Sequence, residues 1–258
     1  MSSRNSEMEG VIAYIHDHLD EPLPLSRLAK RAAYSPFHFT RIFKANTGLS
    51  PHQYVASLKV QKAKSLLVNT NLTIRDISME IGQQSLGTFT TRFTEKVGIS
   101  PMQFRKTPRQ ISNYMASLQE RNNWSQQTKM KHSYNKVEGT IDADIALEGV
   151  ILIGLFNKPI PEGLPQYGTL LSSLGYFCFT DVKPGIYYLM ATAVFWNMQA
   201  NEILVPNQTL RAKADAPIYV KAETAIPYQS LRLRGPRLDD PPILISLPLL
   251  MKNYLNRT

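Results

Sequence analysis

The sequence contains one helical pattern twice, as FHFTRIFKANTGLSPHQY at residues 37–54 and as GTFTTRFTEKVGISPMQF at residues 87–104. The register pairs Phe39 with Phe89, Thr40 with Thr90, Phe43 with Phe93, Gly48 with Gly98, Ser50 with Ser100, Pro51 with Pro101, Gln53 with Gln103 and Tyr54 with Phe104. In each copy the apolar residues recur at three- and four-residue spacing, which is typical of helices that bury one face. A serine followed by proline predicts the start of a further helix, because serine caps a helix and proline is tolerated at its first position. The repeat therefore predicts two copies of one helical unit.

The residues before each copy complete the unit. LSRLAKRAAY at 25–34 and IRDISMEI at 74–81 each place apolar residues on one helix face. A tight turn follows, with Gly82 in the second unit, and a second helix begins at Ser35 or Ser85. Two helices joined in this way form a helix-turn-helix, whose second helix can enter the major groove of DNA. Between the units, the apolar spacing after Pro51 predicts a connecting helix of about 15 residues.

The positive charge of the chain is concentrated where the repeat lies. The net charge of +9 comes from 29 Lys and Arg against 20 Asp and Glu. Residues 1–110 hold 15 of the basic and 8 of the acidic residues, whereas residues 136–258 hold 11 of each. A basic half beside a neutral half predicts a polyanionic partner for the first half only. The alternative is a basic surface that only aids solubility.

After Lys136 the pattern changes to short apolar and β-branched runs, which are separated by turn signals such as KPG and NKPIPEG. The runs are GTIDADIAL, GVILIGLF, GYFCFTDV, GIYYLMATAVFW, APIYVKA, QSLRLR and PPILISL. We therefore predict two domains: an all-α double helix-turn-helix of about seven helices, followed by a mainly antiparallel β-sandwich. The expected divisions are residues 1–110 for the helical domain, 111–138 for a helix and a polar linker, and 139–258 for the β-sandwich.

We find no pattern that indicates catalysis or a metal site. A glycine-rich phosphate loop, a nucleophile elbow and a paired-carboxylate motif are all missing. His16 and His18 lie about 200° apart on their predicted helix, which is unsuited to sharing a metal. We therefore expect no enzyme activity, cofactor or metal. The polar first residues and short apolar runs predict neither a secretory signal nor a membrane span, so we expect a cytoplasmic, nucleoid-associated protein.

The repeat also resembles a known family. LAKRAAYSPFHFTRIFKANTGLSPHQYVASLKVQKAKSLL, followed by TIRDISMEIGQQSLGTFTTRFTEKVGISPMQFRK, is similar to the DNA-binding domain of the AraC/XylS family of bacterial transcription regulators. The resemblance covers about residues 8–108 and is carried by the order, spacing and doubling of the motif. It implies that two helix-turn-helix units joined by one long helix bind two successive major grooves on one face of the duplex.

The resemblance also implies which residues contact DNA. The positions that contact bases are Phe37, Thr40 and Arg41 in the first unit and Leu86, Gly87, Thr88, Thr90 and Thr91 in the second. We also expect phosphate contacts, because free backbone N–H groups at helix starts such as those at Ser50 and Ser100 bind anions. The residues expected to contact phosphates are Ser35, His38, Ser50, Ser85, Arg92 and Ser100. Arginine can bind guanine as a fork and phenylalanine can pack on a thymine methyl group. The alternatives are core packing for Phe37, a phosphate contact or a surface ion pair for Arg41, and simple capping for the serines.

The second unit departs from the family pattern. The family usually has an arginine two residues before the final phenylalanine, but Thr91 occupies that position here and the arginine follows at Arg92. One residue turns a helix by about 100°, so Arg92 is expected to face away from the bases, toward a phosphate. Gly87 also lowers helix propensity by about 1 kcal/mol. We therefore expect weak direct base recognition by the second unit.

The second half weakly resembles the transthyretin-like, carboxypeptidase-regulatory type of β-sandwich over about residues 139–222. In the AraC/XylS family a companion domain usually senses a small molecule or dimerises the protein, which makes an effector and a homodimer candidate partners here, with RNA polymerase as a third and no membrane. The apolar tail at 238–255 is expected to pack as a strand and a short helix, or against a partner chain. We interpret the whole chain as a sequence-specific transcription regulator. The alternatives are a non-specific architectural DNA-binding protein, and an enzyme acting on DNA or sugar in the second half.

Overall fold

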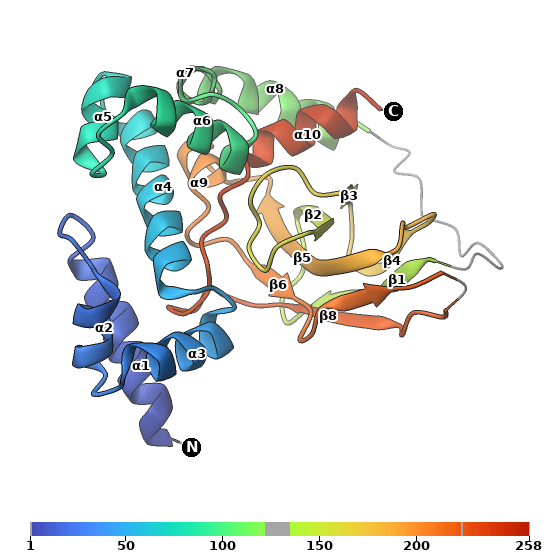
Figure 1. The fold of residues 1–258 in the computed structure, drawn as a ribbon. Helices are drawn as coiled ribbons and strands as arrows, with labels where there is room; N and C mark the ends of the chain where they lie inside the picture. Colours follow the sequence, from blue (N-terminus) through green and yellow to red (C-terminus); the bar gives the residue numbers. More distant parts are fainter. Residues whose placement is uncertain (1, 122–134, 223, 258) are drawn as a thin grey trace.

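The computed structural model describes residues 2–121, 135–222 and 224–257 (Figure 1), and the side chains from Glu7 onward. The expected linker falls largely on residues 122–134, which lie outside the described residues. In the described ranges the helices are α1 (Ser2–Asp17), α2 (Leu25–Arg31), α3 (Pro36–Thr47), α4 (Pro51–Asn69), α5 (Ile74–Glu80), α6 (Leu86–Val97), α7 (Pro101–Lys106), α8 (Pro108–Gln119), α9 (Ala200–Leu204) and α10 (Leu247–Leu255).

Helices α1 to α7 form the expected double helix-turn-helix. The two units are α2–α3 and α5–α6, and α4 runs between them with α3 at one end and α6 at the other (Figure 1). Phe39 and Phe43 of α3 are fully buried, as are the equivalent Phe89 and Phe93 of α6. The repeated aromatic residues are therefore the core of each unit.

Both units close with the same backbone turn. In the first, the amide of Tyr34 donates to the carbonyl of Ala29 at 3.0 Å, and in the second the amide of Gln83 donates to the carbonyl of Ser78 at 2.8 Å. Such a bond satisfies a carbonyl left over at a helix end and requires a left-handed residue just before the donor. The tight turn expected from the sequence is thus confirmed in both units.

Replacing Ala33 by glycine should stabilise the protein by about 1 kcal/mol. Ala33 has a left-handed φ of 54°, at the place that Gly82, with a φ of 72°, occupies in the second unit. A Cβ in this region costs about 1–2 kcal/mol, and the greater freedom of glycine in the unfolded chain offsets part of the gain. Urea unfolding followed by circular dichroism measures the change. Gly82→Ala is the matched control and should destabilise; an Ala33→Gly variant less stable than the parent would contradict this view of the turn.

The residues after Lys136 form two sheets. The strands are β1 (Val137–Ala143), β2 (Gly149–Phe156), β3 (Tyr167–Leu171), β4 (Gly175–Phe179), β5 (Gly185–Phe195), β6 (Arg211–Lys213), β7 (Ile218–Val220) and β8 (Gln229–Leu233). One sheet has the order β4-β1-β8 and the other β3-β2-β5-β6, with β7 also paired to β5. The named pairs are antiparallel except β1 with β8, which is parallel. The expectation of a mainly antiparallel β region is confirmed, while the sandwich arrangement stays a prediction.

The two sheets share one hydrophobic cluster. Val137 and Ile141 from β1 join Ile153 and Leu155 from β2 in it, and all four are almost completely buried. The side chains of β1 alternate between buried and more exposed, whereas every residue of β2 is buried. Strand β2 is therefore covered on both faces.

Part of that cover is supplied by the C-terminal segment. Residues 242–248 are buried, and α10 packs beside α8 (Figure 1). Val150 and Leu152 of β2 belong to the same cluster as the cores of the helix-turn-helix units, together with Leu244 of the C-terminal segment. One continuous core thus joins the helical part to the outer face of the β2-containing sheet. Within the described ranges, no helix has the length and apolar character needed to cross a lipid bilayer.

The expected strand in the tail, PPILISL at residues 241–247, is wrong. The amides of Leu244 and Ile245 both donate to the carbonyl of Pro161 at 3.0 Å, and that of Ser246 donates to the carbonyl of Val97 at 2.9 Å. Because these amides bond to a loop and to a helix end, the segment does not join a sheet. The expected short helix in the tail is confirmed as α10.

Candidate nucleic-acid interface

The N-terminal end of α3 presents an exposed aromatic residue. Phe37 is 84% exposed, although the neighbouring Phe39 is fully buried. Ser35 caps the helix, its Oγ accepting from the amide of His38 at 3.4 Å. The structure therefore excludes core packing of Phe37 and leaves its ring free for an apolar contact outside the protein.

Arg41 lies one turn further along the same face. Its side chain is exposed, and its Nη2 lies 3.4 Å from Nδ1 of His38. His38 in turn packs edge-on against Tyr34, with ring centroids 5.0 Å apart. Among the described residues no carboxylate lies within ion-pair distance of Arg41, so the surface ion pair is excluded in the free protein. Thr40 is half-buried, and its hydroxyl donates to the carbonyl of Pro36 at 2.8 Å.

The corresponding face of α6 carries no charged side chain at the predicted base-contacting positions. Leu86 is 42% exposed, Gly87, Thr88 and Thr91 are exposed, and Thr90 is half-buried. Hydroxyls and one leucine can contact many bases but form no bidentate pair with any of them. Weak base recognition by the second unit stays a prediction.

Arg92 points toward the turn of its own unit. Its Nη1 lies 3.5 Å from Oε1 of Gln83, which belongs to the turn between α5 and α6. Ser85 caps α6, its Oγ accepting from the amide of Thr88 at 3.3 Å. The expected contact of Arg92 with a phosphate rather than with bases stays a prediction.

Ser50 and Ser100 form matching capping boxes at the starts of α4 and α7. The Oγ of Ser50 accepts from the amide of Gln53 at 3.3 Å, and the Oγ of Ser100 accepts from the amide of Gln103 at 3.3 Å. The amide of each serine in turn donates to Oε1 of its glutamine at 3.0 Å. Capping is therefore established for both serines, while their contact with phosphate stays a prediction.

The sequence did not predict that the second half contacts the C-terminal ends of both α3 and α6. Gly48 ends α3 with a φ of 80° and lies against Pro159 and Lys213. Gly98 ends α6 with a φ of 88° and lies against Ile245 and Leu249. A side chain at Gly98 would clash with a methyl group of Leu249 and one of Ile245, and the left-handed φ would strain its backbone.

Hydrogen bonds and an ion pair reinforce the contact at α6. The amide of Gly163 donates to the carbonyl of Lys96 at 2.6 Å, and the ammonium of Lys96 forms an ion pair with Glu162. Glu162 is also paired with Lys158 at 2.7 Å. The loop between β2 and β3 is thus fixed to the end of α6.

Two buried polar residues of α4 also bond to the C-terminal segment. The hydroxyl of Tyr54 donates to the carbonyl of Leu238 at 3.0 Å. The ammonium of Lys64 donates to the carbonyl of Ile243 at 2.9 Å and lies 5.6 Å from the ring centroid of Phe104. Lys64 is completely buried, and this burial lowers its pKa to about 7. The helix that joins the two units is therefore covered by the end of the chain.

With this geometry in place, comparison with known proteins identifies the helical part. Residues 28–107 match a family described as a helix-turn-helix domain. The multiple antibiotic resistance protein MarA of Escherichia coli (strain K12) is 32% identical over 110 residues, which cover 87% of MarA and 42% of this chain. The chain belongs to the AraC/XylS family. Its duplicated unit is the DNA-binding domain that defines the resemblance.

Two further matches each cover about two fifths of the chain. The uncharacterized HTH-type transcriptional regulator YobQ of Bacillus subtilis (strain 168) is 41% identical over 96 residues, which are 37% of this chain and 40% of YobQ. The chain thus spans well under half of that relative. Among solved structures, the DNA-binding domain of the global transcriptional factor AdpA, in complex with a target DNA, is 28% identical and has a TM-score of 0.38. That match covers 40% of this chain and 92% of the AdpA domain.

Proposed function

We propose that this AraC/XylS protein is a sequence-specific transcription regulator whose α3 and α6 enter two successive major grooves. The observation that carries the proposal is the placement of two exposed helix N-termini at opposite ends of α4. Helix α4 has 19 residues and is therefore about 28 Å long, close to the roughly 34 Å between neighbouring groove segments. The basic excess of residues 1–110 supports the same partner, because phosphate neutralisation dominates affinity for DNA.

Selection from a random DNA pool tests this proposal. The purified full chain should enrich a site whose conserved positions fall in two clusters about one helical turn apart, with stronger conservation in the cluster bound by α3. Binding to that site should exceed binding to random duplex by about 10³ at one fixed salt concentration. Equal affinity for both duplexes would favour the alternative of a non-specific architectural protein.

Arg41 and Arg92 should contribute in different ways. Arg41→Ala should weaken binding by about 1–3 kcal/mol and relax the preference at one base pair, because an exposed guanidinium without a carboxylate partner is available for a guanine edge. Arg92→Ala should weaken all sequences alike and reduce the salt slope by about one. Titrations on a matched set of single-base variants at several salt concentrations distinguish the two. A change of base preference in Arg92→Ala would contradict the role given to that residue.

The second half, as we infer it, controls the relative position of α3 and α6 rather than contacting DNA. It touches the C-terminal ends of both helices, at Gly48 and Gly98, and leaves Phe37 and Leu86 at their N-terminal ends exposed. Its balanced charge offers little attraction for a polyanion. The shared cluster between its two sheets supports a β-sandwich over residues 139–258. Effector sensing and dimerisation are the two uses of such a domain that this arrangement accommodates.

A further inference from the structure

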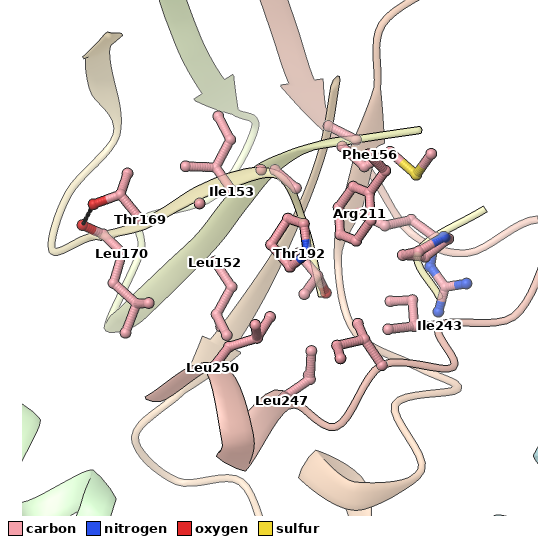
Figure 2. A pocket seen from close by; sticks show the side chains of 18 of the residues that line it. Leu152, Ile153, Phe156, Thr169, Leu170, Thr192, Arg211, Ile243, Leu247 and Leu250 are labelled. Carbon is pink, nitrogen blue, oxygen red and sulfur yellow. Dashed lines mark hydrogen bonds between the residues drawn. The ribbon is translucent and has the colours of Figure 1, made fainter. Parts of the chain in front are cut away.

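A cavity of about 140 Å³ lies between the β3-β2-β5-β6 sheet and the C-terminal segment (Figure 2). Its apolar wall comes from both sides. Leu152 of β2 and Leu170 of β3 line one side, and Ile243, Leu247 and Leu250 line the other. An apolar cavity of about 150 Å³ holds one benzene molecule. The cavity therefore suits the apolar body of a molecule about the size of one six-membered ring.

One end of the cavity is basic. Arg211, Lys213 and Arg234 line it together with one carboxylate, Asp240. That carboxylate is already engaged, because both of its oxygens accept from Arg234, at 2.7 and 2.8 Å. In Figure 2, Arg211 lies on the side of the cavity away from Leu170.

Within the described residues, Arg211 is held by carbonyl groups and forms no ion pair, although Asp240 lies near enough to favour its charge. Its Nη2 donates to the carbonyls of Pro206 and Asn207, at 2.8 and 3.1 Å. Its burial lowers its pKa, which means that the surroundings do not fully compensate the charge. For Lys213 the described residues provide neither a hydrogen bond nor an ion pair, and its ammonium lies at the end of α3 beside Gly48. This end of the cavity is therefore suited to a negatively charged group.

We propose that the cavity binds a small carboxylic acid with a compact ring or branched aliphatic body, its carboxylate facing Arg211 and Lys213 and its body between Leu152 and Leu250. The residues that wall the cavity also bond to the DNA-binding helices. Ile243 accepts from Lys64 of α4, and Ser246, which follows Ile245, donates to Val97 of α6. A ligand that moves this segment changes the cover on α4 and the support at the end of α6. The effect of the ligand on DNA binding rests on the proposed function, whereas the binding of the ligand to the cavity does not.

Titration of the full chain without DNA tests the site. The probes are benzoate, cyclohexanecarboxylate and 4-methylpentanoate, with benzamide as the neutral counterpart of benzoate and acetate as a head group without a body. Calorimetry and methyl NMR should give one site per chain for at least one of the three acids, with shifts at Leu152, Leu170 and Leu250. Benzamide should bind at least about tenfold more weakly than benzoate, and acetate should not bind. No binding of any of the three acids up to about 10 mM would overturn the proposal.

Two variants locate the site. Lys213→Gln removes a charge that makes no hydrogen bond or ion pair within the described residues, on a side chain that remains partly accessible to solvent. It should weaken the binding of the acids while leaving the binding of benzamide unchanged. Leu250→Phe enlarges a half-buried side chain in the α10 wall of the cavity, so it narrows the cavity and should weaken the binding of all probes. The unfolding temperature of each ligand-free variant shows that it is folded. Unchanged acid binding in both folded variants would place the ligand elsewhere and overturn the proposal.

The last measurement separates the site from its effect. With the best acid at saturation, affinity for the selected DNA site should change by about fivefold or more, and Leu250→Phe should reduce this response at the same acid concentration. An unchanged affinity in the presence of bound acid would overturn the coupling while the site stands. Failure to bind DNA specifically without any acid would instead contradict the proposed function.

Discussion

Replacing Lys64 by methionine should make the protein about 2 kcal/mol more stable at pH 7. Lys64 is completely buried, and its one protein hydrogen bond in the described structure goes to a neutral carbonyl, that of Ile243. Burying an ammonium without a carboxylate is strongly unfavourable, and methionine keeps the length of the side chain without the charge. The lost bond to Ile243 offsets about 1 kcal/mol of the gain. Urea unfolding of both proteins at pH 7 measures the difference.

The pH dependence gives the same prediction a second and sharper test. Burial lowers the pKa of Lys64 from 10.5 in the unfolded chain to about 7 in the folded protein. Between these values the unfolded chain binds the extra proton, so the free energy of unfolding should rise with pH, by up to about 1.4 kcal/mol per pH unit. The Lys64→Met variant should lose this rise between about pH 7.5 and 9.5. Its advantage over the parent should shrink accordingly as the pH increases.

The other groups with shifted pKa values affect stability mostly outside the range from pH 7.5 to 9.5, where Lys64 is tested. The pKa of His16 is lowered by burial, so its contribution lies below its ordinary value of 6.5. Burial raises the pKa of Tyr54, which lowers stability only above about pH 10. Partial burial also lowers the pKa of Lys213, so this residue adds to the same pH dependence. Lys213→Gln is therefore the matched control, and it should keep most of the rise in the free energy of unfolding with pH. A parent protein whose stability is flat from pH 7.5 to 9.5 would show that Lys64 is not buried as a free amine.

Local signals explain why the helical half was predictable from the sequence. The local pairs Ser50-Pro51 and Ser100-Pro101 mark the starts of two helices, and both serines cap their helices as expected. Strand β2 was equally clear, because GVILIGLF is a continuous apolar run that begins at a glycine and spans residues 149–156. In contrast, β3, β6 and α9 were not predicted. Strand β3 contains Gly168 and Thr169 rather than an apolar run, and β6 and α9 are three and five residues long.

The candidate site was predicted only in part, for a related reason. The exposed faces of α3 and α6 follow from helical periodicity, and Phe37 stands out because its ring lies on the polar face. The cover over α4 does not follow from any local pattern. Lys64 and Ile243 are 179 residues apart in the sequence, and a lysine in a helical pattern ordinarily indicates the solvent face. The buried lysine and the contacts at Gly48 and Gly98 required the tertiary structure.

Replacing Leu244 by alanine should destabilise the whole protein by about 3 kcal/mol. Leu244 is completely buried and belongs to the cluster that also contains the aromatic cores of both helix-turn-helix units. Truncation of a buried leucine loses transfer free energy and leaves a cavity, with a usual cost of about 2–5 kcal/mol. Urea unfolding gives the size of the loss, and Ile145→Ala, at a 52% exposed position between β1 and β2, is the matched control that should change stability by less than about 0.5 kcal/mol.

The distribution of the loss matters more than its size, because the sequence alone suggests a helical domain that closes on itself. If the C-terminal segment is part of the core of that domain, Leu244→Ala should lower hydrogen-exchange protection in α4 and α6 as well as in β2. The helical signal in circular dichroism and the exchange of the strands should then report one shared transition. If α4 and α6 instead keep the hydrogen-exchange protection of the parent protein and only the β region loses protection, the DNA-binding helices fold without the end of the chain. In that case the second half could influence DNA binding only through its contacts at Gly48 and Gly98, and a ligand in the cavity would have no path through Lys64.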